Sequence, residues 1–153
     1  MKKILVSACL LGCECRYDGK SKPCDKVIAL AGKKDTVLIP VCPEQMGGLP
    51  TPRIPSERQR TSKGTLRSIS RPAAVLAKDG SDVSSYYKKG AAMALEIAKL
   101  NGVDCAILKS GSPSCGKGII YDGSFSGTKA PGNGVTTELL LAEGYEVFSE
   151  EEL

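Results

Sequence analysis

Three cysteines in this sequence end runs of mainly apolar or small residues. The runs are "KILVSAC", which ends at Cys9, "TVLIPVC", which ends at Cys42, and "ILKSGSPSC", which ends at Cys115. Glu44 follows Cys42 by two residues, in a segment rich in proline and glycine. Thiolates are soft ligands for zinc, copper(I) or iron–sulfur clusters, and a carboxylate beside them can transfer protons. These four residues could therefore form a metal site with its own acid–base group.

The absence of histidine narrows the chemistry further. The chain has seven cysteines and no histidine among its 153 residues. An odd number of cysteines argues against a fully paired disulfide framework. Without histidine, acid–base chemistry at neutral pH falls to carboxylates, lysine, cysteine, hydroxyls or water. We expect the thiols to be ligands, nucleophiles or small buried hydrophobes.

The remaining four cysteines give weaker signals. Cys13 and Cys15 form a C-x-C pair that could bind metal or be redox active, but two thiols in one loop are a weak pattern. Cys24 falls in the first turn of an expected helix, and Cys105 lies within an expected strand. We expect structural roles for all four.

Strand and helix patterns alternate along the chain. Strands are predicted at residues 2–8, 36–41, 73–77, 103–110 and 145–149, helices at 21–33, 82–100 and 134–144, and a hairpin at 118–127. Residues 43–71 are too rich in proline, glycine, serine and arginine for long regular structure, so a functional loop is expected there. The alternation predicts one α/β domain over residues 1–153, a three-layer sandwich with a mostly parallel, Rossmann-like sheet.

The expected fold suggests where the three cysteines lie. In open parallel sheets, ligands bind beyond the carboxyl ends of the strands, and Cys9, Cys42 and Cys115 all lie at or shortly after such ends. The three residues are too far apart in sequence for a local zinc knuckle, so the fold must bring them together. A metal centre bound by these three thiolates and by no histidine would keep one coordination position open. The spacing alone does not choose between a zinc site and an iron–sulfur cluster.

Charge and composition limit the partners. The net charge is +4, and the segment Arg53–Arg71 contains six basic residues and one acid, Glu57. We expect this segment to be solvated and mobile, with binding of an anion as the alternative. An aromatic content of 5% disfavours a base-stacking surface for nucleic acid without excluding one. The acidic tail "SEEEL" is expected to fray, and the lack of long apolar runs favours a cytoplasmic protein that does not enter a membrane.

Four sequence blocks carry a resemblance to a known family. The blocks are "ILVSACLLG", "CRYDG", "CPEQMGGLPTPR" and "KSGSPSCG", and together they resemble the thiouracil desulfidase family from Ile4 to about Asn133. The resemblance implies a 4Fe-4S cluster held by Cys9, Cys42 and Cys115, with one iron left open. It also implies hydrolytic removal of sulfur from a small-molecule thiolated pyrimidine, which gives uracil and sulfide from thiouracil.

The resemblance also suggests roles for neighbouring residues. Glu44 would activate the attacking water or carry its proton, and Ser110 or Ser112 would hold the substrate carbonyl or that water. Gly47, Gly48 and Gly116 would let the backbone approach the cluster and donate N–H groups to it. The alternative is a zinc-binding or nucleotide-binding module without catalysis, or a thiol redox protein.

Overall fold

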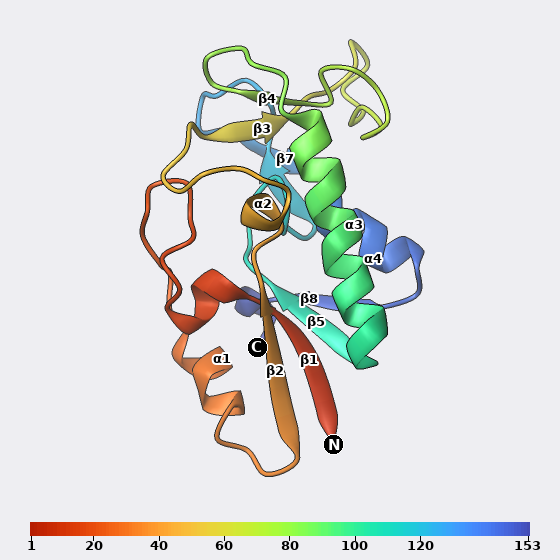
Figure 1. Cartoon of the computed structure of the whole chain (residues 1–153). Coiled ribbons are helices and arrows are strands. Elements are labelled where there is room, and N and C mark those ends of the chain that lie inside the picture. The colour runs from red at the N-terminus through yellow and green to blue at the C-terminus, as the bar shows by residue number, and fades with distance from the viewer.

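A parallel sheet of four strands forms the centre of the molecule (Figure 1). The computed structural model describes residues 1–153. The strands are β1 (Lys2–Ser7), β2 (Thr36–Val41), β5 (Cys105–Leu108) and β8 (Glu146–Ser149), in the spatial order β2-β1-β5-β8. Every neighbouring pair is parallel. The predicted parallel α/β sheet is confirmed.

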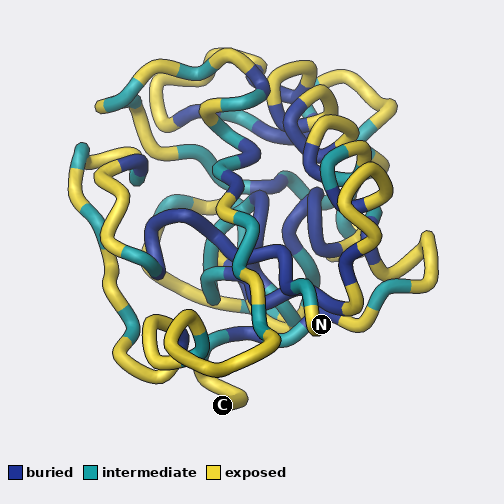
Figure 2. Tube along the Cα trace, turned by 60° about the horizontal axis from the view of Figure 1, so that its bottom comes forward, coloured by how far each residue is buried: buried dark blue, intermediate teal, exposed yellow.

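Helices cover both faces of this sheet. They are α1 (Asp25–Leu30) on one face, and α3 (Ser84–Asn101) with α4 (Val135–Ala142) on the other (Figure 1). Val27 of α1 joins Ile4 in one apolar cluster, whereas Leu140 of α4 joins Leu5 in a second. Adjacent residues of β1 thus point to opposite faces, as the pleat requires. Buried residues fill the interior between the layers in Figure 2, so the predicted three-layer sandwich is confirmed.

The longest helix, α3, agrees with its sequence signals. The Asp82 carboxylate accepts the Ser84 N–H at 3.0 Å just before the helix begins. Ala91, Ala94 and Ala98 form its buried face, at the spacing that the helical repeat requires. Gly102 ends the helix in the left-handed region at φ 62°, where glycine carries no Cβ penalty.

The order in which strands are added to the sheet reverses between β1 and β5. β2 pairs with one edge of β1, and β5 pairs with the other. In doubly wound sheets, the segments that follow two such strands turn to opposite faces of the sheet. They leave a crevice beyond the carboxyl ends of the strands at this switch point. The crevice lies between the segments that follow β1, β2 and β5.

Seven further elements are short, and all of them except β4 contribute residues that line the crevice. They are the 3₁₀ turn η1 (Ala8–Leu11), helix α2 (Pro43–Met46), strands β3 (Ser56–Arg58), β4 (Val75–Ala77), β6 (Ile119–Tyr121) and β7 (Lys129–Pro131), and the 3₁₀ turn η2 (Glu150–Glu152). β3 pairs with β4 and β6 pairs with β7, both antiparallel. The predicted hairpin is confirmed, although its second strand begins two residues beyond the expected range because its connecting loop is longer. No helix combines the length and apolar character needed to cross a membrane.

Two glycines allow α2 to pack directly on the backbone of α3. A Cβ on Gly90 would lie 1.9 Å from the Pro43 carbonyl oxygen, and one on Gly47 would lie 2.0 Å from the Tyr86 carbonyl oxygen. No side chain can occupy either position without moving one helix. The position of α2, which carries Glu44 in its first turn, is therefore fixed by the main chain of α3.

Two expectations for polar segments were wrong in part, although residues 61–65 of the basic segment are exposed as expected. The basic segment is not simply solvated, because Arg58 is 1% exposed and its guanidinium donates to the Asn133 carbonyl at 2.8 Å. The acidic tail does not fray, because Ser149 and Glu152 form a capping box in η2. The tail residues 151–153 stay exposed, but this local capping box and the Ser110 N–H, which donates to Glu150, hold the tail in place.

Candidate functional site

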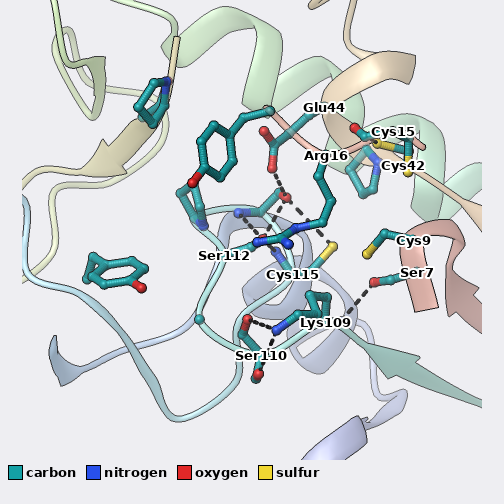
Figure 3. Close-up of a pocket in the computed structure, with 18 of the residues that line it drawn as sticks. Ser7, Cys9, Cys15, Arg16, Cys42, Glu44, Lys109, Ser110, Ser112 and Cys115 are labelled. Carbon is teal, nitrogen blue, oxygen red and sulfur yellow. Dashed lines mark hydrogen bonds between the residues drawn. The ribbon is translucent and has the colours of Figure 1, made fainter. Parts of the chain in front are cut away.

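A cavity of about 370 Å³ opens at the carboxyl ends of β1, β2 and β5. The structure brings Cys9, Cys42, Cys115 and Glu44 into its lining, and Figure 3 shows the cysteines on one side of the cavity. These four residues come from three segments that only the sheet topology brings together.

Cys9 and Cys115 are held on either side of the switch point. Cys9 lies in η1 directly after β1 and is 7% exposed. Cys115 follows β5 and is 4% exposed. Its N–H donates to Ser112 Oγ at 2.7 Å, and its carbonyl accepts from Thr137 Oγ1 at 2.8 Å. Both thiols are thus set on constrained backbone.

Cys42 and Glu44 are positioned by α2. Cys42 occupies the position before the helix in extended conformation, and Pro43 begins the helix, where its missing N–H costs nothing. The Cys42 thiol points to the Cys15 carbonyl at 3.7 Å. The side chain of Glu44 is 13% exposed.

Three donors hold the Glu44 carboxylate. Oε1 accepts Arg53 Nε at 3.0 Å and the Tyr87 hydroxyl at 3.0 Å, while Oε2 accepts the Ser114 hydroxyl at 2.7 Å. The side chain of Arg53 is only 6% exposed, so the ion pair is sheltered from solvent. Burial raises the pKa of Tyr87 well above its usual value, with the Glu44 charge adding to the effect, so this phenol stays a neutral donor. The carboxylate is fixed in one orientation beside the cysteines.

A chain of hydroxyls connects Glu44 to the Cys115 loop. Ser114 Oγ lies 3.0 Å from Ser112 Oγ and 3.6 Å from Cys115 Sγ. Ser112 Oγ also accepts the N–H groups of Ser114 and Cys115 at 3.2 and 2.7 Å. Ser114 donates to Glu44, so the Ser112 proton is directed to Ser114 Oγ. Ser112 therefore has its hydrogen bonds satisfied within the loop, and Ser114 is the serine in contact with the carboxylate.

Ser110 lies at the rim, where the C-terminal turn docks. Its N–H donates to both Glu150 carboxylate oxygens at 3.0 Å, and its hydroxyl donates to Glu151 Oε1 at 3.1 Å. Lys109 Nζ lies 3.5 Å from Glu150 Oε1. The acidic tail thus holds the loop between β5 and Cys115.

Three residues of this site were missed by the sequence reasoning. From the sequence, no site role was proposed for Ser114, Arg53 was treated only as part of a basic segment, and metal binding or redox activity was considered for Cys15 but a structural role was favoured. Cys15 is 5% exposed and lines the same cavity as the other thiols (Figure 3). For Ser114, the available signal was its position directly before Cys115.

The three glycines expected to donate N–H groups to a cofactor donate them to the backbone instead. The N–H groups of Gly47, Gly48 and Gly116 donate to the backbone carbonyls of Pro43, Gln45 and Ser112. A Cβ on Gly116 would lie 2.4 Å from Ile120 Cγ2. These glycines instead allow close packing of the segments that carry Cys42 and Cys115.

The pKa values of Cys15, Cys42 and Cys115 are raised above the usual thiol value, so these three thiols are protonated at neutral pH. Burial raises the pKa of Cys115 to about 12, although hydrogen bonds from Ser7 and Ser114 oppose this. The pKa of Cys42 is raised by its hydrogen bond with Cys15 and then by burial. The bond with Cys42 lowers the pKa of Cys15, but the bond with Cys9 and burial outweigh it and raise that pKa to about 11. Any metal centre bound here must displace thiol protons.

The donor set fits an iron–sulfur cluster. Four thiols and no imidazole line the cavity, and cysteine thiolates are the usual ligands of such clusters. No group of three or more His, Cys, Asp or Glu side chains is arranged to hold a single metal ion. A four-iron cluster makes a different demand, because each cysteine ligand binds a different iron.

Comparisons with known proteins agree on one family. The family model described as 2-thiouracil desulfurase matches residues 4–152. The uncharacterized protein YbbK of Bacillus subtilis (strain 168) is 45% identical over 151 residues, which cover 98% of this chain and 97% of that protein. A solved structure of the 4Fe-4S-dependent thiouracil desulfidase TudS matches with a TM-score of 0.83 and 42% identity, and the match covers 100% of this chain and 93% of that one. This chain therefore belongs to the 2-thiouracil desulfurase family.

Proposed function

We propose that this chain is an iron–sulfur-dependent desulfidase that replaces the sulfur of a thiolated pyrimidine with oxygen from water and releases sulfide. The observation that carries the proposal is the convergence of Cys9, Cys42 and Cys115 with Glu44 in one cavity at the switch point of the sheet. Family membership and the match to TudS support this reaction class and an iron–sulfur cofactor. The cavity volume of about 370 Å³ falls in the range that accepts small molecules.

Cys9, Cys42 and Cys115 are the proposed cluster ligands. Each lies at the end of a different backbone segment that is fixed by the sheet, by α2 or by hydrogen bonds of its loop. A cluster held by three cysteines would supply an iron with an open position, a soft Lewis acid suited to a thiocarbonyl sulfur.

Glu44 is the proposed base for the attacking water. Arg53 and Tyr87 donate to Oε1 and fix the plane of the carboxylate, so Oε2 faces the Ser114 hydroxyl beside Cys115. A water near Oε2 can give up a proton to it as the water oxygen attacks the ring carbon. Overall, the thiocarbonyl and one water become a carbonyl and hydrogen sulfide, and no electrons are transferred.

Two of the three serines have roles in shaping this arrangement. Ser112 holds the Cys115 loop through two N–H groups, and Ser114 connects that loop to Glu44. Ser110 lies at the entrance beside Glu151, where its hydroxyl can meet the substrate. The cations Arg16 and Lys129 also line the cavity and suit the carbonyl oxygens of a pyrimidine.

The alternative of a zinc module has less support. A single zinc needs thiolates about 2.3 Å from one metal, and no such group of ligands is arranged in the structure. A nucleotide-binding module without catalysis would not require the sheltered Glu44 carboxylate, which is held by Arg53, Tyr87 and Ser114.

The test is turnover without oxygen. Protein purified anaerobically is incubated with 2-thiouracil, and uracil and sulfide are measured together. We expect both products in equal amounts, and we expect Glu44→Gln to keep the visible absorbance of the cluster while turnover falls by about 100-fold or more. Glu146→Gln, exposed at the start of β8 and outside the cavity lining, is the control and should stay close to the unsubstituted enzyme. Loss of absorbance together with turnover in Glu44→Gln would assign Glu44 a structural role and refute its role as the base.

A further inference from the structure

The hairpin of β6 and β7 supplies one wall of the cavity. Tyr121 ends β6 and Lys129 begins β7, and both residues line the cavity. They face each other as the last pair of the hairpin ladder before its connecting loop. Lys129 Nζ lies 5.3 Å from the centroid of the Tyr121 ring. The hairpin thus brings an aromatic ring and a cation together at the cavity.

Glu57 of β3 attaches the loop of this hairpin to the neighbouring strand pair. Its Oε1 accepts the Gly123 N–H at 2.9 Å and the Phe125 N–H at 3.2 Å, and neither N–H has another acceptor within the protein. Gln59, directly after β3, donates from Nε2 to the Gly123 carbonyl at 3.1 Å. These three hydrogen bonds join residues 64 to 68 positions apart, and Figure 1 shows β7 close to β3.

The loop backbone is shaped for this attachment. A Cβ on Gly123, where φ is 99°, would lie 2.7 Å from the Arg58 carbonyl oxygen, so only glycine lets the loop approach β3 this closely. Phe125 has a φ of 56°, in the left-handed region that bulky residues rarely adopt. Such backbone persists only where surrounding contacts hold it, and Glu57 accepts the N–H groups of these two residues.

The hairpin itself supplies little rigidity. Its ladder has three residue pairs, and a two-stranded hairpin on its own is marginally stable. Ile120 is the one buried residue of the two strands, and Arg60 donates to the Pro131 carbonyl at 2.9 Å, so these contacts hold the base of the hairpin. The end next to the loop is held by Glu57 and Gln59.

We propose that Glu57 is a positioning residue for substrate binding, which holds the loop of residues 122–128 against β3 and so fixes Tyr121 and Lys129 at the cavity wall. The inference rests on the proposed function. The tyrosine ring offers a flat surface to a pyrimidine, and the lysine offers a cation to a carbonyl oxygen. Glu57 acts on the substrate through these two residues. Loss of the attachment therefore weakens binding and leaves Glu44 and the thiols in place.

Four variants isolate the attachment. Glu57→Ala removes the acceptor of both N–H groups, whereas Glu57→Gln keeps a side-chain carbonyl that can accept them. Gly123→Ala separates the loop from β3 by a different route and, unlike Glu57, Gly123 does not line the cavity. Ser126→Ala is the matched control, because its hydroxyl bonds only within the loop, to Ser124 and Thr128.

Hydrogen–deuterium exchange of residues 122–128 measures the attachment and needs no cluster. We expect exchange about tenfold faster in Glu57→Ala and Gly123→Ala, because their loops open to solvent more often. Glu57→Gln and Ser126→Ala should exchange like the unsubstituted protein. Unchanged exchange in Glu57→Ala and Gly123→Ala would overturn the inference.

Steady-state turnover of 2-thiouracil measures the consequence for binding. We expect KM to rise several-fold in Glu57→Ala and Gly123→Ala while kcat stays within about twofold, because the reacting groups are unaltered. Glu57→Gln and Ser126→Ala should keep the KM of the unsubstituted enzyme. A purely structural role would instead lower the fraction of active enzyme, and hence kcat, without raising KM.

The outcomes separate this inference from the proposed function. A raised KM in Glu57→Gln with unchanged exchange would mean that the carboxylate itself contacts the substrate. Faster exchange without a higher KM would mean that the hairpin does not position the substrate. Either result would overturn the inference and leave the desulfidase proposal standing. Absence of turnover in unsubstituted enzyme that contains its cluster would refute the proposed function and the substrate role of Glu57 with it.

Discussion

The two ends of the central sheet contain equally buried cysteines in different surroundings. At the amino end of β5, Cys105 is 6% exposed, while at the carboxyl ends Cys9 and Cys115 are 7% and 4% exposed. Cys105 belongs to the same apolar cluster as Cys9, but unlike Cys9 it does not line the cavity. Cys115, by contrast, lies within 3.6 Å of a hydroxyl that is bonded to a carboxylate. Burial alone therefore does not make a thiol part of a site; its position relative to the strand ends does.

Substitution of cysteines at the two ends should give the largest contrast. We expect Cys42→Ser, and likewise Cys9→Ser and Cys115→Ser, to lose the brown colour of anaerobically purified protein, because serine is a poor ligand for the cluster. Cys105→Ser should keep the colour and lose only stability, since it buries a hydroxyl in an apolar cluster. Visible absorbance per chain measures both effects. Retained colour in all three carboxyl-end variants would remove the distinction between the two ends.

The second contrast compares two ion pairs. Arg53→Gln leaves the buried Glu44 carboxylate without its cation, so we expect a loss of about 3–5 kcal/mol in the free energy of unfolding together with a loss of turnover. Lys99→Gln breaks the exposed pair with Glu143 near the amino end of the sheet and should cost at most about 1 kcal/mol. Urea denaturation of both variants tests the difference. Similar losses of unfolding free energy in both variants would mean that the Arg53–Glu44 pair contributes no more to stability than an exposed pair.

The third contrast compares a glycine-to-alanine substitution at two positions, one packed against backbone and one with free space around it. Gly90→Ala places a Cβ on the Pro43 carbonyl, so we expect it to destabilise the protein by about 1–3 kcal/mol and to lower turnover by shifting Glu44. Gly32→Ala, just before β2, has 3.7 Å to its nearest neighbour and should leave stability and activity nearly unchanged. Thermal denaturation and turnover are measured for both. An active, fully stable Gly90→Ala protein would show that α2 can move without consequence.

The smallest contrast concerns two glutamates near the C-terminus. Glu150→Gln weakens the hold on the Ser110 N–H at the carboxyl end, so we expect a loss of about 1 kcal/mol and a modest rise in KM. Glu146→Gln, exposed at the start of β8, should have no measurable effect. Steady-state kinetics distinguish the two variants. A rise in KM for Glu146→Gln alone would contradict the proposed function of the tail.

The sequence predicted the layers of the fold because each element carries its own pattern. The period of apolar residues distinguished α3 from the strands, and glycine at position 102 marked its end. The carboxyl-end position of Cys9, Cys42 and Cys115 then followed from the general topology of parallel sheets. These inferences need only local periodicity and a rule that holds for the whole fold class.

The contacts within the site could not be predicted in the same way. The ion pair of Glu44 with Arg53 depends on how the segment after α2 turns back, and the contact of Glu44 with Ser114 joins residues 70 positions apart. Burial of Cys15 depends on an irregular loop in which the three residues before it are exposed. Composition averages over such a loop, whereas the side chains are positioned by individual hydrogen bonds. The basic segment and the acidic tail were misjudged for the same reason.

The central claim is that the thiols at the carboxyl end of the sheet hold an iron–sulfur cluster. Iron, zinc and acid-labile sulfide should be measured per chain in protein purified and kept without oxygen. The account predicts iron and sulfide in near-equal amounts with little zinc. Zinc without sulfide, or protein without bound metal after anaerobic purification and cluster reconstitution, would contradict it.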